Sequence, residues 1–276
     1  MQFTSDVISL ESEGPVATLW LDRETERNAL GSAFWRDLPA AAAVIAQEPT
    51  VRVLVIAARG PHFTVGLDLK EMSLTLGEGA PTSGSRATRN ASTYRAIRAM
   101  QDAVSSIAQL TVPVIAAVHG YCIGAGVDLI SACDIRLCCA DAIFSVRETK
   151  VAIVADLGTL QRLPRIIGAG HVAELAFTGK DIDAARAAAI GLVNSVHGAH
   201  PIDVLDAAYQ LAGEIAANSP LAVRGTKAVL AANDGRTVGE GLDFVAQWNT
   251  MYLHSNDLAE AVTAFVERRP PHFNGD

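Results

Sequence analysis

The sequence predicts an α/β protein in which a largely parallel sheet is followed by a helical segment. Half of the 276 residues are hydrophobic and only 5% are aromatic, which is the usual balance of helices packed on a sheet. In the first half of the chain, short β-branched runs alternate with alanine-rich stretches, the pattern of βαβ units. From Gly158 onward the pattern becomes helical.

The first half is expected to hold four strands, at residues 16–22, 51–58, 112–120 and 135–140, of which the first two are β-branched apolar runs. Helical spacing predicts one helix over 32–47, with Pro39 near its start or kinking it, and a short helix over 126–134. The polar, glycine-containing stretch 76–92 is expected to be a mobile lid or a disordered tip that leads into a helix.

The second half is expected to be a series of helices. Each helical stretch ends at or near Gly, Ser-Pro or Asn, which are helix stops, and the last two are expected between Leu242 and Arg269. We therefore divide the chain into an α/β core of residues 1–200 and a helical C-terminal segment of residues 201–276.

Charge and cysteine content exclude several classes of function. The net charge is −8 and no basic run occurs, so no nucleic-acid surface is expected. No stretch is apolar enough to span a membrane, and the N-terminus lacks a signal pattern. The four cysteines have neither Cys-x-x-Cys spacing nor a histidine pair, which favours small buried side chains over a metal site, in a cytoplasmic protein.

Two glycine-bearing turns lie between a strand-like and a helix-like segment: HFTVGLDLKEM (62–72) and HGYCIGAGVDLISACD (119–134). Such a turn leaves backbone N–H groups unpaired at a helix start, where the helix dipole favours negative charge. One turn alone indicates only close packing, whereas two on one scaffold can supply the converging donors of an oxyanion hole. Neither turn has the spacing of a nucleotide-binding motif.

Three acidic residues come with or after the second turn: Asp128, Glu148 and Asp156. Each has a purely structural interpretation. Asp128 can favour the dipole of its helix, Glu148 can pair with Arg147 or Lys150, and Asp156 can cap the helix that follows it.

A functional interpretation arises because Glu148 and Asp156 flank the apolar run 151–155, which is expected in the protein interior. Burying an unpaired carboxylate is costly, so a carboxylate at each end of such a run indicates chemistry.

Five stretches, in order from Val7 to Arg269, resemble the crotonase superfamily, also called the enoyl-CoA hydratase/isomerase family. They are RNAL (27–30), HFTVGLDLKEM, PVIAAVHGYCIGAGVDLISACDIRLC, GTLQRLPRIIG and AFVERR (264–269). The resemblance implies a crotonase-like spiral of ββα units with a helical C-terminal trimerisation segment, and a homo-oligomer that is a trimer or a hexamer.

The resemblance also implies an acyl-CoA thioester substrate and no cofactor, since coenzyme A is part of the substrate. The thioester oxygen would be held by the backbone N–H groups of Leu67 and Ala125. Residues implied to contact substrate or coenzyme A are Thr64, Val65, Gly66, Asp68 and Lys70, together with Phe265 and Arg268 from a neighbouring subunit.

The acidic trio is similar to that of the Δ3,5-Δ2,4-dienoyl-CoA isomerases, whereas hydratases have two glutamates at the first two positions. The chain departs from that subfamily at Lys150 and Ala152, where an acidic residue and a glycine are more usual. Moving a proton from C2 to C6 needs two separated acids, one to take and one to give. We assign Glu148 to C2 and Asp156 to C6, with Asp128 positioning or tuning Glu148, and expect the group to titrate jointly.

Three alternatives stay open. A 2-enoyl-CoA hydratase would use Asp128 and Glu148, with Asp156 as a helix cap. A thioester hydrolase would share the oxyanion hole but attack the carbonyl. A catalytically retired paralogue that binds RNA or acts as a scaffold is disfavoured by the net charge and by the retained acids.

Overall fold

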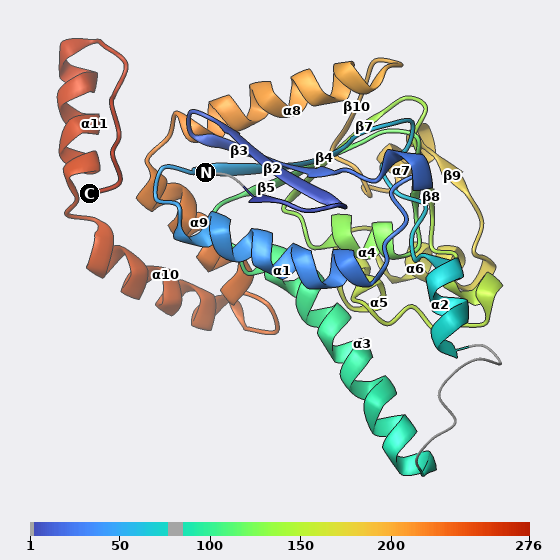
Figure 1. The fold of residues 1–276 in the computed structure, drawn as a ribbon. Helices are drawn as coiled ribbons and strands as arrows, with labels where there is room; N and C mark the ends of the chain where they lie inside the picture. The colour runs from blue at the N-terminus through green and yellow to red at the C-terminus, as the bar shows by residue number, and fades with distance from the viewer. Residues whose placement is uncertain (1–2, 77–84) are drawn as a thin grey trace.

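The computed structural model describes residues 3–76 and 85–276, and within them a mixed seven-stranded sheet forms the body of the molecule (Figure 1). Its strand order is β1-β2-β3-β4-β5-β7-β10, antiparallel from β1 to β3 and parallel from β3 onward. The strands are β1 (Phe3–Thr4), β2 (Ile8–Glu13), β3 (Val16–Leu21), β4 (Val53–Ala58), β5 (Val114–Val118), β7 (Ile135–Cys139) and β10 (Ser195–His197). A smaller sheet in the order β6-β8-β9 is formed by β6 (Tyr121–Ile123), β8 (Ile143–Ser145) and β9 (Ile182–Asp183).

The parallel strands are apolar throughout because the main sheet is covered on both faces. All six residues of β4 are buried, with Leu54 and Ile56 in one core and Val53 and Val55 in the other. Alternate side chains of a strand point to opposite faces, so one continuous apolar run supplies two cores.

Helices cover the two faces of the main sheet unequally. Helix α8 (Pro201–Ala216) packs along one face, and α1 (Ser32–Gln47) and α4 (Ala125–Ser131) lie on the other, with α3 (Arg86–Ala108) beyond α1 (Figure 1). The shorter helical segments near the site are α2 (Leu69–Leu76), the 3₁₀ helix η2 (Glu148–Val151), α5 (Thr159–Arg162), α6 (Ala169–Thr178) and α7 (Ala184–Ala189).

Two parts of the chain extend from this body. The first half of α3 projects away from it, and so do α10 (Val238–Tyr252) and α11 (Asn256–Glu267), which follow α9 (Pro220–Ala232) (Figure 1). In the described residues, no helix is long and apolar enough to cross a membrane.

The predicted α/β architecture is confirmed, and so is α1, whose bounds coincide with the expected 32–47 and which contains Pro39. The antiparallel start of the sheet and the short strands β6, β8, β9 and β10 were not predicted. All four cysteines are free and buried, as expected. The boundary at residue 200 stays a prediction, although α8 beyond it contributes to the second core.

Two expectations need correction. The stretch 76–92 is not one loop, because Leu76 ends α2 and Ser85 caps α3, which begins at Arg86; residues 77–84 lie outside the described residues. The apolar run 151–155 is not in the interior, since only Ala155 is buried and Val154 is 71% exposed. This run follows η2 along the surface, so its apolar composition cannot be explained by core packing.

Candidate active site

The two glycine-bearing turns lie against each other. A Cβ on Gly66 would lie 2.6 Å from the Ile123 carbonyl oxygen and 3.6 Å from the Ala125 nitrogen. The segments are joined by backbone hydrogen bonds, from Thr64 N–H to Tyr121 O at 2.8 Å and from Ile123 N–H to Thr64 O at 3.2 Å. Gly66 has a φ of +85°, so both its conformation and its contact exclude a side chain.

The two predicted donors are therefore held close together. Ala125 is the first residue of α4, so its N–H has no partner within the helix. Within residues 3–76 and 85–276, neither the Leu67 N–H nor the Ala125 N–H donates a hydrogen bond to another protein group. Both remain available to an oxygen of a ligand.

Thr64 is fully buried and ties the turns together rather than facing the site. Its Oγ1 donates to Asn28 O at 2.6 Å and accepts from the Gly66 N–H at 3.1 Å. Its methyl group occupies the space that a side chain on Gly126 would need. The Thr64 side chain thus positions the two turns, and the substrate contact expected at this residue stays a prediction.

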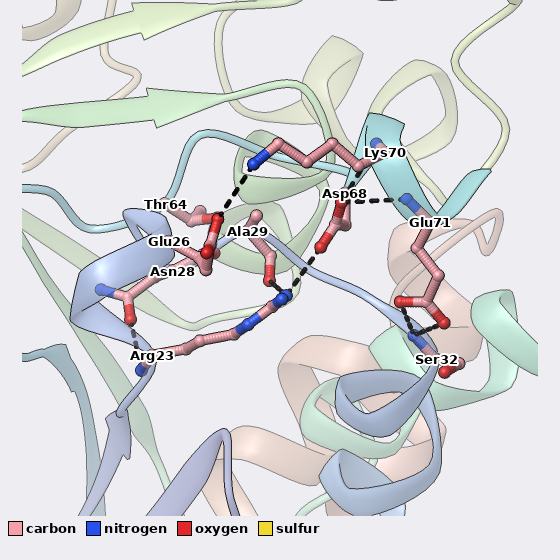
Figure 2. A network of polar contacts seen from close by, with 9 residues as sticks. All are labelled: Arg23, Glu26, Asn28, Ala29, Ser32, Thr64, Asp68, Lys70 and Glu71. Atoms are coloured by element: carbon pink, nitrogen blue, oxygen red, sulfur yellow. Dashed lines mark hydrogen bonds and ion pairs between the residues drawn. The ribbon is translucent and has the colours of Figure 1, made fainter. Parts of the chain in front are cut away.

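Asp68 is likewise engaged by the scaffold (Figure 2). Its Oδ2 accepts from Arg23 at 2.8 Å, and its Oδ1 accepts from the N–H groups of Lys70 and Glu71, both at 3.1 Å. The hydrogen bond from Arg23 lowers the pKa of Asp68. The carboxylate of Asp68 thus holds the start of α2, and the substrate contact expected at this residue stays a prediction.

The remaining residues of this segment are more open to solvent. Lys70 has an 88% exposed side chain, with its Nζ 3.6 Å from a carboxylate oxygen of Glu26, and Val65 is half-buried (Figure 2). Both side chains are therefore at least partly accessible to a ligand, and their predicted contacts with substrate stay predictions.

Asp128, in the first turn of α4, is 1% exposed. Thr159 is the first residue of α5, and its N–H donates to Asp128 Oδ1 at 2.6 Å. Asp128 therefore caps α5 across the site. Asp156 does not cap α5, because the N-cap position is Gly158. Among the described residues, the only hydrogen bond between Asp156 and another side chain is accepted by its backbone oxygen. The interpretation of Asp156 as a helix cap is wrong.

Glu148 is 8% exposed and lies at the start of η2. Its Oε2 is buried without a hydrogen-bond partner, and Oε1 is 3.5 Å from where a Cβ on Gly124 would lie. Arg147 pairs with Asp181 instead, and in the described part of the chain no ion pair reaches Glu148. A charged group left unpaired beside the Gly124–Ala125 turn indicates a functional carboxyl.

The three carboxyl groups influence one another. Burial, together with the negative charges of Asp128 and Asp156, raises the pKa of Glu148 to about 7. Burial likewise raises the pKa of Asp128 to about 6, and it raises that of Asp156. Near neutral pH this cluster therefore holds both protonated and ionised carboxyls, which is what a proton transfer by an acid and a base requires.

Between the two catalytic candidates the backbone takes an unfavourable conformation. Ala152 has a φ of +60°, a left-handed conformation that costs a non-glycine residue about 1 kcal/mol. This is the position at which the resemblance to the dienoyl-CoA isomerases leads us to expect glycine, a residue that adopts this conformation without strain.

Phe265 and Arg268 are not brought to this cluster within one chain. Phe265 is 84% exposed on α11 and Arg268 is the exposed residue that ends it. Helix α11 lies at the far end of the molecule from α2 (Figure 1).

Three residues that shape the site were missed by sequence reasoning. Asn28 accepts from Arg23 N–H and donates to two carbonyl groups beside the first turn. Gln101 and Arg162 hydrogen bond to the backbone at Asp156 and Leu157. The RNAL motif could have indicated Asn28, but nothing local in the sequence marks Gln101.

Comparison with known proteins decides the family. A family model described as enoyl-CoA hydratase/isomerase matches residues 11–276. The chain belongs to the enoyl-CoA hydratase/isomerase family.

Within this family, several relatives share the acyl-CoA chemistry in their names. The chain is 42% identical over 270 residues to the peroxisomal Δ(3,5)-Δ(2,4)-dienoyl-CoA isomerase of Arabidopsis thaliana, covering 98% of this chain and 96% of the relative. It is 41% identical to the mitochondrial Δ(3,5)-Δ(2,4)-dienoyl-CoA isomerase of Homo sapiens, and the match covers 90% of this chain and 75% of the relative. A crotonyl-CoA hydratase of Syntrophomonas wolfei is 32% identical, and the match covers 96% of this chain and 97% of the relative.

Solved structures of the family have the same fold. An enoyl-CoA hydratase from Bacillus anthracis superposes with a TM-score of 0.88 at 31% identity, covering 98% of this chain and 100% of that one. An enoyl-CoA hydratase structure from Streptomyces coelicolor gives 0.89 at 30% identity, covering 98% and 94%. The predicted crotonase-like fold is confirmed.

Proposed function

We propose that this member of the enoyl-CoA hydratase/isomerase family converts a 3,5-dienoyl-CoA into the 2,4-dienoyl-CoA. The observation that carries the proposal is a third carboxyl, Asp156, which caps nothing and lies close enough to Glu148 to raise its pKa. The relatives of similar length with more than 40% identity are named for this reaction.

The first step is removal of a proton from C2 by the Glu148 carboxylate. The electron pair left at C2 is delocalised into the thioester, and negative charge develops on its oxygen. The N–H groups of Leu67 and Ala125 would donate to this oxygen, and they are fixed by the backbone before substrate arrives.

The second step is protonation of C6 by the Asp156 carboxylic acid. The double bonds then lie at C2 and C4, and no atom has been gained or lost. Glu148 ends protonated and Asp156 ionised, so a proton must return between them before the next turnover. Burial raises the pKa of both groups, so each binds a proton more readily than an exposed carboxylate does.

Asp128 acts on this pair without touching the reacting carbons. It accepts from the Thr159 N–H and so holds the chain three residues after Asp156. Its charge also contributes to the raised pKa of Glu148. We therefore assign it the positioning and tuning role expected from the sequence.

Substrate binding is proposed to involve the backbone at Gly66, the half-buried side chain of Val65 and the exposed side chain of Lys70. No cofactor is proposed apart from the coenzyme A of the substrate. Phe265 and Arg268 would reach the site of a neighbouring subunit in a homo-oligomer, a trimer or a hexamer. Support comes from α10 and α11, which extend from the body and expose large apolar side chains (Figure 1). The cytoplasmic location stays a prediction, because the isomerase relatives are named as peroxisomal or mitochondrial proteins.

The second candidate is hydration of a 2-enoyl-CoA by Asp128 and Glu148. Its support is the group of relatives named as hydratases at about 30% identity. Against it stands the engagement of Asp128 by the scaffold, since its Oδ1 accepts from the Thr159 N–H at 2.6 Å.

The test compares wild type with Asp156→Asn, using 3,5-dienoyl-CoA and crotonyl-CoA on the same preparations. Formation of the conjugated 2,4-dienoyl thioester is followed by absorbance. We expect fast isomerisation in wild type, a loss of about 10²-fold or more in Asp156→Asn, and slow hydration by both. Efficient hydration by wild type together with a small effect of Asp156→Asn would support the hydratase instead.

A further inference from the structure

The Asp156 carboxyl is not held in place by its own contacts. Among the described residues, no other residue donates a hydrogen bond to this carboxyl or forms an ion pair with it. Its position relative to Glu148 therefore depends on the backbone of residues 155–159. A proton donor must stand within hydrogen-bond reach of the atom that it protonates, so whatever fixes this backbone controls the second step.

Side chains from three helices fix that backbone. Gln101 Nε2 of α3 donates to Asp156 O at 2.6 Å, and Arg162 Nη1 of α5 donates to Leu157 O at 3.3 Å. On the other side, the Thr159 N–H donates to Asp128 of α4. The segment that carries Asp156 is thus held at three successive peptide groups.

Helix α3 contributes to two of these contacts, directly through Gln101 and indirectly through Ser105, which binds Arg162. Gln101 and Ser105 are one helical turn apart, and Ser105 Oγ accepts from Arg162 Nη2 at 3.0 Å. Gln101 Oε1 accepts from Arg98 Nη1 at 2.7 Å. Because Arg98 can only donate and a carbonyl can only accept, these partners fix the amide with its NH₂ toward Asp156.

The Arg162 guanidinium reaches its position only because residue 158 is a glycine. Gly158 has a φ of +128°, and a Cβ there would overlap Arg162 Nη1. Arg162 also lies close enough to Asp128 for its charge to favour the ionised form of that carboxyl. Gly158 leaves room for Arg162, and Arg162 and Gln101 together hold the backbone that carries Asp156.

We propose that Gln101, Ser105 and Arg162 form an Asp156 clamp, whose function is to hold the distal acid at C6 and so to direct the reaction to isomerisation. Gln101 and Arg162 are positioning residues in this account, since neither touches the reacting atoms. The inference rests on the proposed isomerase function. It assigns these residues to the second proton transfer alone, because Glu148 is held separately by η2.

The experiment measures the two proton transfers separately. Gln101→Met removes the donor while keeping the length of the side chain, and Gln109→Met makes the same change at the exposed end of α3 as a control. Each variant is assayed for kcat and KM with 3,5-dienoyl-CoA. Exchange of the C2 hydrogens into deuterated water is followed by mass spectrometry.

We expect Gln101→Met to lower kcat for isomerisation about 10- to 100-fold, as for a displaced catalytic group, with KM changed by less than about threefold. C2 exchange should stay within about threefold of wild type, because the first step is intact. Arg162→Lys retains the positive charge but lacks the planar guanidinium, whose two separate Nη groups reach Leu157 O and Ser105 Oγ. It should therefore also lower isomerisation more than C2 exchange. Gln109→Met should match wild type.

An unchanged kcat in Gln101→Met, with wild type an efficient isomerase, would refute the clamp and leave the proposed function standing. Equal losses of C2 exchange and isomerisation would also refute it, since the residue would then support the whole site. If wild type hydrates but does not isomerise, the proposed function fails first and the clamp fails with it.

Discussion

The buried pair of Asp128 and Glu148 sets the pH range in which the protein can work. Glu148 must be ionised to remove a proton, and its pKa is about 7 because of burial and neighbouring negative charge. Activity limited by this step should therefore rise as the pH passes about 7. Asp128 contributes to that value through its charge.

Asp128→Asn should move this rising limb to lower pH. Removing a nearby negative charge makes ionisation of Glu148 easier, which lowers its pKa, while the asparagine oxygen can still accept from Thr159 N–H. The measurement is kcat/KM for isomerisation against pH, which reports the groups of the free enzyme. Asp243→Asn, at an exposed position on α10, is the control. If the rising limb of the pH profile stayed in place or moved to higher pH in Asp128→Asn, the tuning role assigned to Asp128 would be contradicted.

At the residue scale, the three acids could be predicted because carboxylates in apolar, glycine-punctuated stretches are unusual in themselves. Their partners could not. Arg147 was a plausible partner for Glu148 by its position in the chain, yet it pairs with Asp181 on another strand edge. Gln101 acts on Asp156 from a helix distant in sequence. Such contacts depend on the packing of segments, which no local pattern encodes.

At the scale of elements, the turn at Gly66 determines where the Leu67 N–H group points. Glycine is needed at position 66 for two independent reasons, a φ of +85° and the approach of the Ile123 carbonyl. The following helix α2 strengthens the arrangement, because Glu71 accepts from the Ser32 N–H at the start of α1, at 3.0 Å (Figure 2). That contact replaces the side-chain cap which Gly31 cannot supply.

Gly66→Ala should therefore lower both stability and activity. Strain and the contact with Ile123 O should cost about 1–3 kcal/mol of unfolding free energy, and displacement of the Leu67 N–H should reduce kcat about 10²-fold. Urea unfolding and the isomerase assay measure the two effects. Gly170→Ala, at a helical position in α6 with open space around it, should lose neither. A Gly66→Ala variant with kcat near that of wild type would argue against the Leu67 donor.

Some helices and strands could be predicted from the sequence more accurately than others. Helix α1 was predicted to its ends because sixteen residues give its periodicity room to show. The strands β6, β8 and β9 contain two or three residues each, too few for an alternating pattern. They form because the chain pairs around the second turn, where Tyr121–Ile123 meets Ile143–Ser145.

For the whole molecule, the exposed apolar side chains of α11 indicate a surface that is covered in the working protein. Leu258, Val262, Phe265 and Val266 recur at helical spacing along one side of α11, and all are exposed in the single chain. Contiguous exposed apolar surface of this kind marks an interface. A second copy of the chain is the occupant that the proposed homo-oligomer requires.

Phe265→Asp should therefore shift the protein toward monomers, because a carboxylate would be buried in the interface. Light scattering after size-exclusion chromatography measures the mass, and the same samples should lose about tenfold or more in kcat/KM if Phe265 serves a neighbouring site. Asn256→Asp adds the same charge at the polar start of α11 and should leave the mass unchanged. A monomeric wild type, or a Phe265→Asp variant with unaltered mass, would contradict the interface.

The two donors proposed to activate the thioester are peptide N–H groups, and this separates what must stay fixed from what is free to vary. Substitutions at Leu67 and Ala125 change the shape of the pocket but leave the N–H in place, whereas Gly66 and Gly126 are confined by their neighbours. A lineage can thus refit the pocket to a new acyl chain, or rearrange its acids for another reaction, without rebuilding the means of activation. Because the backbone activates the thioester while side chains choose the reaction, one fold can carry relatives named as isomerases and relatives named as hydratases.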